Sequence, residues 1–109
     1  MTDSANGSDC DCPPTPEFPG AEVREFPIIN RKGLHARATA KFVQCVENFD
    51  AQITVSRCGE TVGGDSIMGI LTLGAGIGTT ITVAARGVQA TEALDALEAL
   101  VANRFGEDE

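Results

Sequence analysis

The sequence contains neither tryptophan nor tyrosine, and it has only five phenylalanines. Its core must therefore be built mainly from aliphatic side chains, and a hydrophobic content of 42% is in the range of globular domains. There is also no apolar run near the roughly 20 residues that a membrane-spanning helix needs. The polar first ten residues lack the basic and apolar segments of a secretory signal. We therefore expect one cytoplasmic domain.

Basic residues are scarce. The chain has 8 Lys and Arg against 16 Asp and Glu, which gives a formal net charge of −8. An acidic protein repels polyanions, so we expect no nucleic-acid partner and no direct contact with a membrane. The few basic residues are concentrated, because five of the eight lie between Arg24 and Lys41. This concentration indicates a local positive site.

The chain has four cysteines but only one histidine, which limits the metal sites it could form. Cys10 and Cys12 lack the further Cys or His ligands that tetrahedral zinc needs. We expect no bound metal and no tightly bound cofactor, and the role of this pair stays open. Cys45 and Cys58 are predicted to be free, reduced thiols, because disulfides are rare in the cytoplasm.

The composition divides the chain into three parts. Residues 1–22 hold four of the five prolines, and such a segment buries too little apolar surface to offset its ordering entropy. It is predicted to be a disordered tail. Residues 106–109, Gly-Glu-Asp-Glu, are predicted to be a frayed acidic end. The structured domain should therefore span residues 23–105.

Hydrophobic periodicity predicts seven elements within that domain. They are a strand at 23–29, a helix at 36–48, a strand at 51–57, a short second strand within 58–64 after a turn at Gly59, a helix of one to two turns at 67–73, a strand at 79–85 and a helix at 90–105. Pro27 cannot donate to a ladder, so the first strand should lie at a sheet edge or turn the nitrogen side of its proline to solvent. The order β-α-β-β-α-β-α predicts an α+β fold, an open-faced sandwich of a four-stranded antiparallel sheet with three helices on one face.

The single histidine, His35, stands where the first helix should begin. A helix N-terminus presents unpaired amides and partial positive charge, which suit an anion. The backbone amides of Ala36 and Arg37 would be free donors, and the Arg37 guanidinium could bind a phosphoryl group through two hydrogen bonds. Neutral imidazole is a nucleophile that forms covalent intermediates. From the residues alone, a histidine that only caps the helix or lies on the surface is the favoured interpretation.

The segment "GLHARATAKFV", residues 33–43, resembles the active-site signature of HPr, the histidine-containing phosphocarrier of the phosphoenolpyruvate-dependent phosphotransferase system. "DSIMGILTLG", residues 65–74, resembles the regulatory-serine segment of the same family. The element order also matches, and the resemblance covers residues 23–105. It implies a monomeric phosphocarrier rather than an enzyme. His35 would accept a phosphoryl group on Nδ1 from enzyme I and pass it to IIA-type acceptor proteins, with Arg37 stabilising the group and Gly33 shaping the site.

One departure from the family pattern follows Arg37. The family usually has proline there, whereas this chain has Ala38. Proline suits the first helical turn because its φ is preset and it lacks an N–H. We expect the carrier chemistry to survive this change. The departure leaves open whether the protein serves sugar transport or a nitrogen-type regulatory branch.

Ser66 precedes the short predicted helix, where a serine side chain is a good N-cap. The resemblance implies a second role, phosphorylation by an HPr kinase/phosphorylase. A phosphoryl group there would place about two negative charges beside an apolar surface. That surface is predicted to dock enzyme I and the acceptors, and it consists of Ala36, Ala40, Ile67, Met68 and Leu71.

Two other functions fit parts of the sequence. A binding module of the same fold could act through Ser66 and make little use of His35. An unrelated small enzyme could use His35 as a general base, but it would need a pocket with converging polar groups, which the sequence does not indicate.

Overall fold

The computed structural model describes residues 19–107. The elements, in chain order, are β1 (Glu22–Pro27), α1 (Ala36–Glu47), β2 (Gln52–Arg57), β3 (Glu60–Gly63), α2 (Ile67–Thr72), β4 (Thr80–Arg86), α3 (Ala90–Ala102) and the 3₁₀ turn η2 (Arg104–Gly106). The predicted order is therefore confirmed, with η2 as an unforeseen addition.

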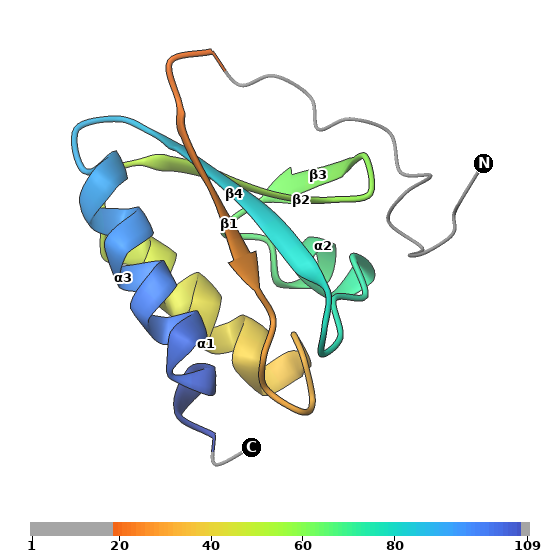
Figure 1. Cartoon of the computed structure of the whole chain (residues 1–109). Coiled ribbons are helices and arrows are strands. Elements are labelled where there is room, and N and C mark those ends of the chain that lie inside the picture. Colours follow the sequence, from red (N-terminus) through yellow and green to blue (C-terminus); the bar gives the residue numbers. More distant parts are fainter. Residues whose placement is uncertain (1–18, 108–109) are drawn as a thin grey trace.

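The four strands form one antiparallel sheet in the order β1-β4-β2-β3. Figure 1 shows α1 and α3 side by side across one face of this sheet, with α2 on the same side. The predicted open-faced sandwich is confirmed. Among the described strands β1 pairs with β4 alone, so it is an edge strand, in agreement with the Pro27 argument.

The core lies between the sheet and the helices. Alternation along the strands sends every second side chain into it, as with Phe26 of β1 and Ile81 of β4, which are register partners. α1 buries Thr39, Phe42, Val43 and Val46 along one face. It also buries Ala38, whose exposed fraction is 0%. A side chain larger than methyl would have little room there.

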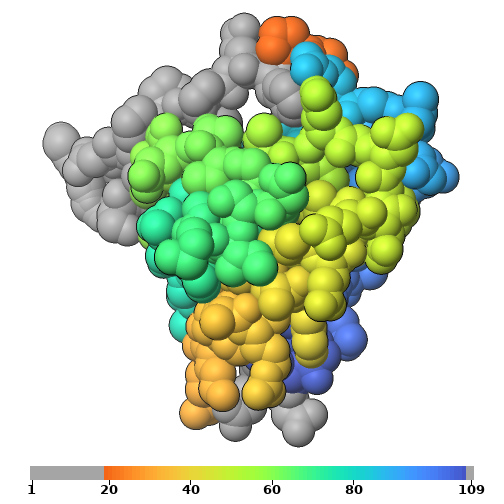
Figure 2. Space-filling view, turned by 180° about the vertical axis from the view of Figure 1, so that it is seen from behind, coloured from red at the N-terminus to blue at the C-terminus, as the bar shows by residue number. Residues whose placement is uncertain are grey.

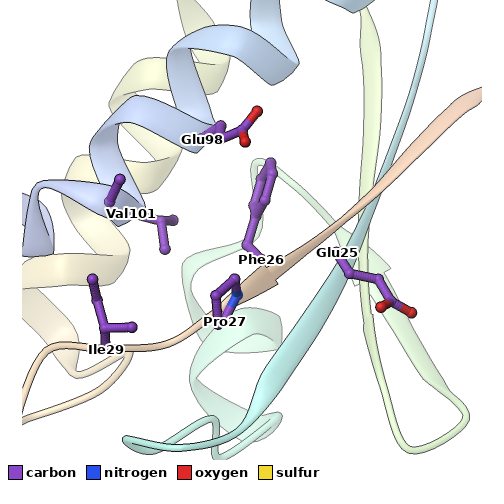
Figure 3. A pocket seen from close by; sticks show the side chains of 7 residues that line it. Glu25, Phe26, Pro27, Ile29, Glu98 and Val101 are labelled. Atoms are coloured by element: carbon purple, nitrogen blue, oxygen red, sulfur yellow. The ribbon is translucent and has the colours of Figure 1, made fainter.

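A small pocket of about 200 Å³ lies between the end of β1 and α3. Figure 3 shows Phe26, Pro27 and Ile29 on one side of it, with Glu98 and Val101 of α3 opposite. Its lining is mainly apolar and does not include His35, Arg37 or Ser66. It therefore does not supply the polar pocket that a general-base enzyme centred on His35 would need.

Of the two cysteines predicted to be free thiols, one is free and the other is not. Cys45 is a free thiol on α1, as predicted, and burial raises its pKa. The prediction of a free thiol at Cys58 is wrong, because Cys58 is disulfide-bonded, and its partner lies outside the described residues. Cys58 is exposed on the turn between β2 and β3, so its sulfur is accessible to another part of the chain. The prediction considered the compartment and not this exposure.

Cys10, Cys12 and most of the predicted tail lie outside the described residues. Within residues 19–107, no helix is long and apolar enough to cross a membrane. In the same range, no group of three or more His, Cys, Asp or Glu side chains is placed to hold a metal ion.

Candidate functional site

The loop between β1 and α1 is held in a tight turn by Asn30. Its side chain is completely buried, and its Nδ2 donates to the carbonyl oxygen of Gly33 at 2.9 Å. The Gly33 amide donates back to the Asn30 carbonyl at 3.1 Å. This reciprocal pair fixes the chain just before His35.

Gly33 is also where the loop touches the segment between α2 and β4. Its φ is +65°, a region that favours glycine, and a Cβ there would lie 2.6 Å from the carbonyl oxygen of Ala75. The next residue strengthens the contact, because the Leu34 amide donates to the same oxygen at 2.9 Å. The predicted shaping role of Gly33 thus has a specific geometric basis.

His35 occupies the N-cap position of α1, and the helix begins at Ala36 as predicted. Its carbonyl oxygen accepts the first helical bond, from the Thr39 amide at 2.8 Å. Its side chain makes no capping hydrogen bond, although imidazole stands where a side-chain cap would act. The imidazole, with 27% of its side chain exposed, is therefore not engaged in holding the helix end.

The groups predicted to receive an anion surround this position. Within residues 19–107, the amides of Ala36 and Arg37 donate to no carbonyl outside the helix. The Arg37 side chain is exposed and forms no hydrogen bond or ion pair with any described residue. The first turn of α1, directly after His35, thus offers free amides, the positive end of the helix dipole and the exposed side chain of Arg37.

One neighbour of the imidazole was missed by the sequence analysis. The Oε2 atom of Glu107 lies 2.5 Å from His35 Nε2, and its Oε1 accepts a hydrogen bond from Asn30 Nδ2 at 2.9 Å. Figure 1 shows why: the C-terminal end of the chain returns to the loop before α1. Glu107 is 72 residues from His35 in sequence, so no local pattern could have indicated the contact.

Ser66 is the N-cap of α2. Its Oγ accepts a hydrogen bond from the Gly69 amide at 3.1 Å, as the sequence predicted for a capping serine. A Cβ on Gly69 would lie only 2.8 Å from that Oγ, so the glycine permits the close approach. The hydroxyl is half-buried and remains at the molecular surface.

The side chains around these two positions include exposed apolar groups. Ile67 and Met68 are 42% and 71% exposed, and Leu71 is half-buried, whereas Ile70 belongs to the core. Ala36 is exposed and Ala40 is half-buried on α1. Figure 2 shows α2 (green) next to the first part of α1 (orange to yellow) on one face of the molecule, and the two helices are in contact.

Residues 23–103 match the family model described as "PTS HPr component phosphorylation site". The chain belongs to the HPr family. This match covers every described element except the first residue of β1 and the turn η2. HPr proteins are phosphocarriers of the phosphotransferase system and not enzymes, so the third function considered above, an unrelated small enzyme, is set aside.

Curated relatives bear two names. The chain is 54% identical over 86 residues to the phosphocarrier protein HPr of Cupriavidus necator, covering 79% of this chain and 97% of that protein. It is 42% identical over 84 residues to the phosphocarrier protein NPr of Shewanella violacea, covering 77% and 92% of the two chains. Both the HPr name and the NPr name therefore occur among similar proteins.

Solved structures agree with the fold. The crystal structure of HPr from Thermoanaerobacter tengcongensis has a TM-score of 0.78 at 39% identity, covering 81% of this chain and 99% of that one. A structure described as an HPr dimer from the same organism has a TM-score of 0.64 at 41% identity, covering 75% and 94%. Crh of Bacillus subtilis has a TM-score of 0.62 at 36% identity, covering 68% and 85%.

Proposed function

We propose that His35 accepts a phosphoryl group on Nδ1 from phosphorylated enzyme I and transfers it to IIA-type acceptor proteins. The observation that carries this proposal is the placement of the partly exposed imidazole at the first turn of α1, without a capping bond. Its neighbours there are the amides of Ala36 and Arg37. A histidine whose role was to cap the helix would use its side chain to close the helix end.

The chemical groups at the start of α1 are suited to binding a phosphoryl group. The phosphoryl oxygens can receive hydrogen bonds from the Ala36 and Arg37 amides and favourable charge from the helix N-terminus. The Arg37 guanidinium is long, permanently charged and uncommitted among the described residues, so it can follow the phosphoryl group during approach and departure. Transfer in either direction then depends mainly on positioning and electrostatics, and the partner proteins supply the remaining catalytic groups.

The partners would dock on the apolar surface of α1 and α2. This surface would use Ala36, Ala40, Ile67, Met68 and Leu71, which lie on two helices that contact each other. An apolar centre bounded by charge is the usual form of a transient interface. We infer a cytoplasmic monomer, since a carrier must present this surface to one partner after another. Sugar transport and nitrogen-type regulation are both compatible with this scheme.

The test is a reconstituted transfer. Incubation with radiolabelled phosphoenolpyruvate and enzyme I should give an acid-labile label on the protein, and a IIA-type acceptor should remove that label. Sedimentation analysis of the same sample tests whether the protein is a monomer. A protein that takes no label from active enzyme I contradicts the proposal. That result would favour the second function, a binding module acting through Ser66.

We also propose that Ser66 is a regulatory phosphorylation site for an HPr kinase/phosphorylase. Its hydroxyl lies at the surface, directly before Ile67 and Met68 of the docking surface. A phosphoryl group would add a charge of about −2 there, which opposes burial of the adjacent apolar side chains by a partner. The modification would therefore weaken docking without requiring the helix to unfold.

A Ser66→Ala variant is expected to lose the acid-stable label that the kinase and ATP give the wild type. It should also lose about 1 kcal/mol of unfolding free energy, because the Gly69 amide loses its capping partner. Ser66→Asn is the matched control, since asparagine caps a helix as well as serine does but has no hydroxyl. It should also remain unlabelled while keeping most of the stability in urea denaturation. Label persisting in both variants would place the site elsewhere.

A further inference from the structure

The chain beyond α3 is held in an unusual conformation. Arg104 and Phe105 have φ angles of 55° and 56°, which non-glycine residues rarely adopt. Such a conformation persists only where surrounding contacts enforce it. Phe105 supplies one of these contacts, because its side chain is completely buried in the core.

A second contact comes from α1. Lys41 Nζ donates to the carbonyl oxygen of Phe105 at 2.6 Å, which fixes η2 against the helix that follows His35. The Glu107 amide then donates to the Arg104 carbonyl at 2.9 Å. The backbone of Glu107 is thus set by a strained turn anchored at two places, and its side chain is directed to the loop before α1.

Both oxygens of the Glu107 carboxylate are engaged there. Oε1 accepts from Asn30 Nδ2 and Oε2 faces His35 Nε2, and only 16% of the side chain is exposed. The Asn30 hydrogen bond, with a contribution from His35, lowers the pKa of Glu107, so the group is a carboxylate at neutral pH. Asn30 also bonds to Gly33, which joins the carboxylate to the turn that positions the histidine.

The chemistry of this contact selects one imidazole tautomer. A carboxylate can only accept hydrogen bonds, so the Nε2 atom facing it must carry the proton. In neutral imidazole the lone pair then lies on Nδ1. We propose that Glu107 is a positioning residue that holds His35 in the Nε2–H tautomer with Nδ1 directed to the phosphoryl donor. This inference rests on the proposed phosphoryl-acceptor role of His35.

The transfer step balances without another reactant. The Nδ1 lone pair forms the new N–P bond, and the bond from phosphorus to the phosphohistidine nitrogen of the donor breaks, its electron pair remaining on the donor. The Nε2 proton stays in the hydrogen bond to Glu107. Phosphorylation makes the imidazole ring more positive, and the adjacent carboxylate stabilises that charge. The aspartate of a Ser-His-Asp triad stabilises its histidine in the same way.

The first test is the tautomer, and the sequence makes it simple because His35 is the only histidine. Long-range ¹H–¹⁵N correlation spectra of the unphosphorylated protein report which ring nitrogen is protonated. The wild type should show Nε2–H. In Glu107→Gln, an amide N–H can donate to Nε2, so the spectrum should shift toward the Nδ1–H form. Glu107→Asp keeps an acceptor and should stay closer to the wild type.

The second test is kinetic. Glu107→Gln should lower kcat for phosphoryl acceptance from enzyme I by roughly ten-fold or more, because the reactive nitrogen is protonated in part of the molecules. KM should stay near the wild-type value, since Glu107 is outside the docking surface. Glu92→Gln, which removes the same charge from an exposed position on α3, is the matched control and should change neither value.

The outcomes separate the two proposals. If the wild type takes no label, the acceptor role of His35 fails, while the tautomer measurement still reports on Glu107. If the wild type is labelled and Glu107→Gln has the wild-type spectrum and kcat, the positioning role is overturned. A fall in kcat that accompanies partial unfolding but leaves the tautomer unchanged also overturns it, and thermal denaturation of each variant detects that case.

Discussion

A His35→Ala variant should accept no acid-labile phosphoryl label from enzyme I, at any time of incubation that fully labels the wild type. The chain offers no second imidazole that could replace the nucleophile, because His35 is its only histidine. The remaining parts of the site cannot form an N–P bond, since amides and a guanidinium only donate hydrogen bonds. The measurement is the acid-labile radioactivity retained on the purified protein.

The same variant should fold normally, which makes the loss interpretable. The imidazole makes no capping bond, and its one side-chain partner among residues 19–107 is Glu107 in a partly exposed pair. Removing such a pair should cost less than about 1 kcal/mol. Arg37→Ala is the matched control, because it removes an exposed neighbour and leaves the nucleophile. It should slow labelling by roughly ten-fold or more without abolishing it. Full labelling of His35→Ala would show that another residue is the acceptor.

The elements were predictable because their signals are local. α1 carries its buried residues at helical spacing, and β2 and β4 alternate apolar and polar side chains. Ser66 is a residue type that caps helices, and a short apolar run follows it. Its position at the start of a helix was therefore predictable from the sequence. The same local character made His35 recognisable as a residue at a helix N-terminus.

The contacts that complete the site were not predictable, because they join distant parts of the chain. Glu107 was assigned to a frayed end, since nothing in its neighbourhood indicates that it reaches Asn30 and His35. The positive φ angles of Arg104 and Phe105 could not be predicted from the sequence either, because neither residue type favours that conformation. The disulfide at Cys58 was also missed, because no pattern in the residues around Cys58 indicates that its sulfur is bonded.

Gly33→Ala should destabilise the protein by about 3 kcal/mol, well beyond the usual effect of a surface substitution. Two costs combine at this position. An L side chain at φ +65° costs roughly 1–2 kcal/mol. The new Cβ would also lie 2.6 Å from the carbonyl oxygen of Ala75 and 2.7 Å from Cα of Gly76, which are backbone atoms that must shift to relieve the overlap. Urea denaturation measures the total.

Gly74→Ala separates these two costs, because Gly74 has nearly the same φ, +66°, and a Cβ added there would meet nothing within 4 Å. It should lose only the conformational part, roughly 1–2 kcal/mol. The difference between the variants is the cost of separating the His35 loop from the segment before β4. That separation also disturbs the turn in which Asn30 holds Gly33 and Glu107, so Gly33→Ala, unlike Gly74→Ala, should slow phosphoryl acceptance. Equal losses of stability and rate in the two variants would contradict this account of the site.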